Sequence, residues 1–296
     1  MEYTKPFLTF EQQADQLISR GMNCDRRVLI EHLKDVGYYR LSGYWHIYKR
    51  EDNTFEPETD FGKIWGLYTF DRQFRLVVLD AIERVEVYFR TQLAYKLAEY
   101  SGPFGFLDSE NLPRLSTDRY DKFIKKSIDA IERSREPFIV HFKTRYGDSH
   151  ALPPYWMLVN TMDFGMMLTL YHGASVEIRN SISGELGISS RVLDSWLVAL
   201  NTVRNTCAHH GRLWNRVLGT APAIPNREND NRWHSPVKIH SDKVFCVLTI
   251  LSYLLFKIAP ETRWRERLFS LISQYPDVDI RRMGFPANWK ESAFWQ

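Results

Sequence analysis

The sequence predicts an all-α protein. Apolar residues recur at helical spacing in one segment after another, and no segment shows the alternation that is typical of strands. At 296 residues, with 44% hydrophobic and 14% aromatic residues, the chain can bury a substantial core. We expect a helical bundle over residues 61–296, preceded by a small helical, aromatic-rich extension over residues 1–60.

The extension is predicted to contain two short helices and an aromatic segment. Thr9 and Asp25 are suited to cap the two helices, because their side-chain oxygens can accept hydrogen bonds from the first turn. The aromatic segment, residues 36–45, reads VGYYRLSGYW. Its rings can pack the extension onto the main body, or they can stack on RNA bases while Arg40 binds phosphate. We favour packing for the rings and phosphate binding for Arg40.

A loop or small hairpin at residues 50–61 leads to the longest helical pattern, residues 64–99. Glu83 and Glu86 lie on its charged side, where such spacing usually forms salt bridges on a solvated surface. In the alternative interpretation, one of these carboxylates faces the site described below and orients a side chain there.

A basic helix is predicted at residues 117–135. From residue 119 to residue 145 there are eight Lys and Arg and four Asp and Glu, a local charge of +4 that exceeds the +3 of the whole chain. This stripe is either a solvated face or a surface that binds a nucleic-acid backbone. Its outward cations include Lys122, Lys125, Lys126 and Arg133.

Further helices are expected at residues 155–171, 176–186, 241–258 and 261–274. The most apolar run, residues 244–256, has thirteen residues without a charge and is too short to span a bilayer, so a buried helix is expected. The N-terminus lacks an apolar signal core, and the three cysteines are scattered without a C-x-x-C pair. These features favour a cytoplasmic protein without membrane contact, metal or disulfide framework.

The conspicuous segment is residues 204–216, RNTCAHHGRLWNR, at the end of an amphipathic helix that Ser189 or Ser190 can cap. At about 100° per residue, four polar side chains lie within about 60° of one another, opposite the apolar stripe. These are Asn205, His209, Arg212 and Arg216. Arg204 lies between the two faces, and no acidic residue occurs from residue 196 to residue 227. The patch therefore suits a phosphodiester.

This segment resembles the R-x4–6-H signature of HEPN ribonucleases, in the form found in the AbiD/AbiF-like abortive infection proteins of bacteria. Residues 36–45, 71–75 (DRQFR), 82–86 (IERVE) and 283–289 (MGFPANW) are similar to the same family's pattern. The resemblance implies a HEPN-type helical bundle and a homodimer in which two such helices face each other. It also implies a role in phage defence and control by a structured small non-coding RNA.

The residues themselves suggest the chemistry. RNA carries its own nucleophile, the 2′-OH, and histidine is the side chain best suited to proton transfer at neutral pH. His209 is therefore the expected acid or base, and Arg204 is expected to stabilise negative charge on the phosphorane. Asn205 can hydrogen-bond the imidazole or a phosphate oxygen. Arg212 and Arg216 are expected to hold the RNA or the partner subunit.

Two functions follow from this interpretation. The favoured one is a metal-independent endoribonuclease toxin, and the alternative is a non-catalytic protein that holds a structured non-coding RNA. The isolated histidines do not form a metal-ligand set, and neither a P-loop nor a dinucleotide glycine fingerprint is present. No cofactor is expected.

Overall fold

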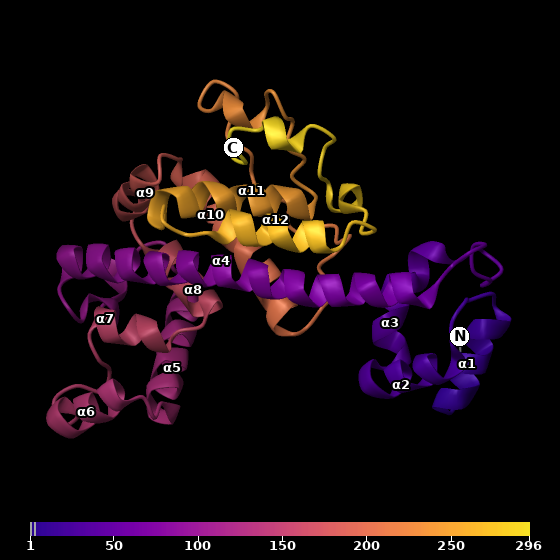
Figure 1. Ribbon diagram of the computed structural model, residues 1–296. Helices are drawn as coiled ribbons and strands as arrows, with labels where there is room; N and C mark the ends of the chain where they lie inside the picture. Colours follow the sequence, from indigo (N-terminus) through magenta and orange to yellow (C-terminus); the bar gives the residue numbers. More distant parts are fainter. Residues whose placement is uncertain (1, 3) are drawn as a thin grey trace.

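The computed structural model describes residue 2 and residues 4–296. This part of the chain contains twelve α-helices, short 3-10 helices and three isolated bridges, and no strand (Figure 1). The all-α prediction is confirmed. The helices are α1 Phe10–Ser19, α2 Arg26–Val36, α3 Tyr38–Trp45, α4 Phe61–Ser101, α5 Thr117–Arg133, α6 Pro137–Tyr146, α7 Tyr155–Leu158, α8 Phe164–Gly173, α9 Val176–Glu185, α10 Ser190–Ala208, α11 Val244–Ile258 and α12 Trp264–Gln274.

The long helix α4 organises the molecule. Figure 1 shows α1–α3 near one end of α4 and α5–α7 near the other, while α10, α11 and α12 lie along one side of it. At about 1.5 Å per residue, its 41 residues span roughly 60 Å. Asp60 caps its N-terminus, where the carboxylate accepts a hydrogen bond from the Lys63 N–H, and Gly102 caps its C-terminus.

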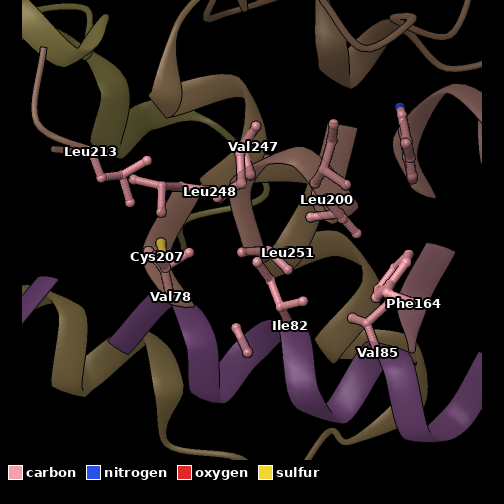
Figure 2. Close-up of a cluster of buried hydrophobic side chains, with 14 of the residues drawn as sticks. Val78, Ile82, Val85, Phe164, Leu200, Cys207, Leu213, Val247, Leu248 and Leu251 are labelled. Atoms are coloured by element: carbon pink, nitrogen blue, oxygen red, sulfur yellow. The ribbon is translucent and has the colours of Figure 1, made fainter. Parts of the chain in front are cut away.

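The core lies where α4 meets α10 and α11. Figure 2 shows Val78 and Ile82 of α4 facing side chains of α10 and α11, while Val85 lies beside Phe164 of α8. Burial of such a side chain contributes about 1.5–3 kcal/mol, so this contact fixes α10 firmly on α4. The facing residues are Leu200, Cys207, Val247, Leu248 and Leu251.

The extension follows its predicted caps. Thr9 forms a capping box with Gln12 at the start of α1, and Asp25 accepts hydrogen bonds from the first turn of α2. The expected small hairpin after α3 is present as an antiparallel bridge between Lys49 and Phe55. The predicted packing role of the aromatic segment is confirmed for Trp45, which is fully buried.

Two element predictions are wrong. The single helix expected at residues 155–171 is divided into α7, the 3-10 helix Val159–Thr161 and α8. The reason is Asp163, whose carboxylate accepts the Met166 N–H at 2.7 Å and so starts a new helix. The helix α6 was not expected; it begins at Pro137, which suits a first helical turn.

The most apolar helix, α11, is buried as predicted, and the C-terminal aromatic residues cover it. The indole of Trp295 donates to the Thr249 hydroxyl at 3.2 Å, and Ser252 donates to the Phe294 carbonyl at 2.7 Å. Among the helices that the structure describes, none is both long enough and apolar enough to cross a membrane.

Candidate functional site

The predicted site residues begin on the last turn of α10 and continue beyond it. Arg204 and Asn205 lie within the helix, which ends at Ala208, and His209 is the C-cap residue with φ −87° and ψ 15°. Asn205 and His209 are four residues apart and share one face. The His209 side chain is exposed, and no described residue forms a hydrogen bond or ion pair with its ring. The imidazole is therefore open to a ligand from solvent.

A left-handed residue terminates α10. His210 has φ 58°, and its N–H donates to the Cys207 carbonyl at 3.0 Å. The Gly211 N–H donates to the Thr206 carbonyl at 2.8 Å. These two bonds form a Schellman motif. Glycine is preferred at this position, because only glycine adopts this conformation without steric cost. In this chain a histidine occupies it.

The expectation that Arg212 and Arg216 share a helical face with His209 is wrong, because the chain turns away after α10. Arg212 donates from Nη1 to the Gly43 carbonyl, and Arg216 donates from Nη1 to the Arg212 carbonyl at 3.2 Å. Both side chains are half-buried. The Arg212 guanidinium holds the segment after α10 against α3, and the Arg216 guanidinium braces that segment internally.

A buried carboxylate anchors that segment to α4. Asp71 is fully buried and accepts the Tyr44 hydroxyl at 2.6 Å and Arg75 Nη1 at 2.5 Å. It also accepts the backbone N–H groups of Leu213 (3.1 Å) and Trp214 (2.6 Å). These contacts of Asp71, the Asp71 junction, were not predicted from the sequence. Its signal is an aspartate within an apolar helical stripe, with an arginine one turn later.

Burial is the main cause of the pKa shifts of Asp71 and its neighbours Tyr44 and Cys207. It raises the pKa of Asp71, while the donors from Tyr44 and Trp214 and the charge of Arg75 act in the opposite direction. Burial also raises the pKa of the Tyr44 phenol. It raises the pKa of the Cys207 thiol to about 12, with the Asp71 charge adding to the effect. Cys207 is therefore a packing residue and no nucleophile at neutral pH.

The second carboxylate of α4 lies beside Arg204. Glu86 is 7% exposed, forms an ion pair with Arg90, and approaches Arg204 with Oε2 3.9 Å from Nε. Arg204 also lies 3.4 Å from the Asn205 side-chain oxygen. Glu83 is exposed and forms no ion pair with a described residue. Of the two carboxylates considered in the sequence, Glu86 is the one that lies beside Arg204, and neither Glu86 nor Arg204 lines the groove at His209.

Arg40 joins the site from α3. Its Nη1 donates to the His210 carbonyl at 2.7 Å. An open groove of about 710 Å³, the His209 groove, lies between α3 and residues 209–212. No described residue that lines it is acidic, whereas Arg40, Arg212 and two imidazoles line it. Such a groove suits a polyanion.

The basic stripe of α5 lies elsewhere. Lys122, Lys125, Lys126 and Arg133 are all exposed, as expected, but Figure 1 shows α5 near the end of α4 that is away from α1–α3. Arg133 donates from Nε to the Asp129 carbonyl at 3.0 Å. The structure does not bring this stripe together with Arg40 and the His209 groove.

The site offers cations and an imidazole. No group of three or more His, Cys, Asp or Glu among the described residues is placed to hold a metal ion. The exposed ring of His209 can accept or donate a proton, and the nearby guanidinium groups can hold phosphate. The arrangement can bind a phosphodiester and transfer protons at it.

Comparison with protein families gives one match. A family model described as "Abi-like protein" matches residues 31–215, which is well over half of the chain. The matched segment begins within α2 and ends at Asn215, seven residues after the end of α10. It therefore includes α3, α4 and α10 with His209. Neither the curated proteins nor the solved structures that were compared match the chain.

Proposed function

Because this chain belongs to the Abi-like protein family, we propose that it acts in abortive infection, a bacterial phage defence, as a HEPN-type RNA-binding protein of the cytoplasm. We further propose that it is a metal-independent endoribonuclease. The observation that carries this proposal is the exposed His209 imidazole at the edge of a cationic groove without a described carboxylate in its lining.

The reaction uses the 2′-OH of RNA as the nucleophile. His209 accepts the 2′-OH proton while the 2′ oxygen bonds to the adjacent phosphorus. The bond from phosphorus to the 5′ oxygen then breaks, and a protonated imidazole donates a proton to that oxygen. The products are a 2′,3′-cyclic phosphate and a 5′-hydroxyl. Arg204 stabilises the negative charge of the phosphorane, and Asn205 orients the imidazole or a phosphate oxygen.

The reaction needs a base and an acid, and we assign one of these roles to His209 and neither to His210, the other imidazole of the groove. We propose that a second copy supplies the other across a two-fold axis. The end of α10 supports this, because Asn205 and His209 are exposed there and a second copy can approach them from solvent.

The other site residues receive supporting roles. Glu86 positions Arg204, and Arg40 binds phosphate at the edge of the His209 groove. Arg212, which lines the His209 groove, and Arg216 beside it bind RNA phosphate in addition to holding the segment after α10. The α5 stripe, Lys122, Lys125, Lys126 and Arg133, binds the backbone of a structured small non-coding RNA that keeps the toxin inactive.

The test is a cleavage assay in excess EDTA. One substrate is a single-stranded RNA, and its matched control has the same sequence with every 2′-OH replaced by 2′-O-methyl. We expect cleavage of the unmodified RNA alone, with 2′,3′-cyclic phosphate ends detected by mass spectrometry. Cleavage of both substrates, activity that requires a divalent metal, or no cleavage by purified protein freed of bound RNA would contradict the proposal.

One observation favours the alternative, a non-catalytic RNA-binding protein. Glu86 holds the Arg204 guanidinium toward α4, where it can serve to fix α10 rather than to contact phosphate. The substitution His209→Gln distinguishes the two functions. A nuclease loses cleavage with this variant, whereas a binder retains its RNA, because glutamine keeps a hydrogen-bonding side chain.

A further inference from the structure

A second groove adjoins the His209 groove. It lies between α1, α3 and the hairpin after α3, and it has a volume of about 720 Å³. We name it the basic groove, because no described residue that lines it is acidic. Its lining combines four cations with the aromatic side chains of α3. These residues are Lys5, Arg20, Lys49 and Arg212, together with Tyr38, Tyr39 and Trp45.

The cations of this groove lie close enough to repel one another. Burial lowers the pKa of Lys49, and the charges of Arg20 and Lys5 lower it further. Three carboxylates of the extension form ion pairs with cations outside this groove: Asp15 with Arg26, Glu11 with Lys34 and Glu56 with Arg50. Like charges gathered without a counter-ion favour the binding of an anion.

The two grooves are continuous. Gln13, Tyr38, Tyr39, Gly43 and Arg212 line both of them. A polyanion that follows this surface passes from the basic groove, over the rings of α3, to the imidazole at the end of α10. The cations of the basic groove come from separate segments, so only the fold brings them to one side of the His209 groove.

We propose that the basic groove binds the single-stranded RNA segment that enters the cleavage site, with phosphates at Lys5, Arg20 and Lys49 and a base on the exposed ring of Tyr39. Tyr39 is 77% exposed and packs edge-on against Tyr38 with ring centroids 6.1 Å apart. Unstacked bases can stack on such rings, whereas a duplex keeps its bases inside. This inference rests on the proposed function. It assigns to the extension the role of binding the substrate strand next to the cleavage site.

The test measures binding of a ten-nucleotide 2′-O-methyl uridine strand with a 5′ fluorescein label, because that probe is not cleaved. Fluorescence anisotropy is recorded at two salt concentrations for the full-length protein freed of bound RNA. The test variant is Arg20→Glu with Lys49→Glu, and the matched control is Lys238→Glu with Lys257→Glu, two exposed lysines outside both grooves. A second test variant, Arg20→Gln with Lys49→Gln, removes the charges without introducing carboxylates, in case the glutamate variant does not fold. Thermal unfolding shows whether each variant is folded.

We expect the groove variants to weaken binding at least tenfold and the control to change it less than about twofold. Loss of two phosphate contacts should reduce the slope of log K against log salt by about 1.4. Undiminished binding by the folded groove variants would overturn this inference, and the EDTA cleavage assay would still decide the proposed function separately. Equal binding of polyglutamate would also overturn it, because the groove would then take any polyanion.

Discussion

Two carboxylates of the same helix, Asp71 and Glu86, are both buried beneath the α10 region, yet their surroundings differ. Asp71 receives hydrogen bonds from two side chains and two backbone N–H groups, and no part of it is exposed. Glu86 contacts two guanidinium groups, one of them 3.9 Å away. The Asp71 carboxylate accepts hydrogen bonds at both oxygens, whereas the Glu86 carboxylate forms a long ion pair with Arg204, which solvent can reach.

This difference indicates that Asp71 stabilises the fold, whereas Glu86 acts on the candidate site. A fully satisfied buried carboxylate fixes the backbone that it binds, so the Asp71 junction determines where the segment after α10 lies. A loosely held arginine can exchange its carboxylate partner for a phosphate oxygen. The comparison therefore predicts that changes at Asp71 act on stability and that changes at Glu86 act on activity.

The largest effect is expected for Asp71→Ala. This change leaves Arg75 and two backbone N–H groups buried without their acceptor, and we expect the free energy of unfolding to fall by about 3–5 kcal/mol. Urea unfolding followed by circular dichroism measures it. Asp80→Ala is the control, because Asp80 forms partly exposed ion pairs with Arg84 and Arg267 whose loss should cost about 1 kcal/mol or less. Equal losses for the two variants would contradict the anchoring role.

A smaller effect is expected for Glu86→Gln. Glutamine keeps an acceptor for Arg90 and removes the charge that orients Arg204, so we expect the cleavage rate to fall about tenfold while the unfolding free energy changes by about 1 kcal/mol. The rate is measured on the single-stranded RNA in EDTA. Glu83→Gln is the matched control on the same helix and should leave the rate unchanged. A large loss of stability without loss of rate would place Glu86 in the framework.

The smallest effect is expected for His210→Gly. His210 has φ 58° at the end of α10, and glycine removes the steric cost of that conformation. Part of this gain is offset, because glycine also gives the unfolded chain more conformational entropy. We expect the free energy of unfolding to rise by up to about 1 kcal/mol. The control is Asn215→Gly, at φ 53°, which should gain less because asparagine tolerates this conformation. A clear loss of stability for His210→Gly would show that its side chain has a structural role.

Much of the fold could be predicted because its signals are local. Thr9, Asp25 and Ser189 cap helices through hydrogen bonds to residues two or three positions away, and the sequence displays that spacing. The end of α10 could not be predicted in this way. His210 adopts the left-handed conformation without the glycine that usually marks it, so the helical pattern appeared to continue to Arg216.

The candidate site could be proposed from the sequence where one segment supplies its residues, but not where the fold brings separate segments together. Arg204, Asn205 and His209 stand together in the chain and could be proposed from their spacing. Asp71 contacts Leu213 and Trp214 across many intervening residues, and no sequence spacing records that contact. The same holds for Lys5, Arg20 and Lys49, which lie in separate segments and share one groove only after folding.

The proposed function requires that His209 takes part in the chemistry and not in holding the fold together. The most direct measurement is the single-turnover cleavage rate of His209→Ala in EDTA, with His210→Gly as the neighbouring imidazole control and unfolding curves for both. We predict a fall of about 10²–10⁴-fold for His209→Ala, unchanged stability, and near wild-type cleavage for His210→Gly. An unchanged rate in a folded His209→Ala protein would contradict the claim.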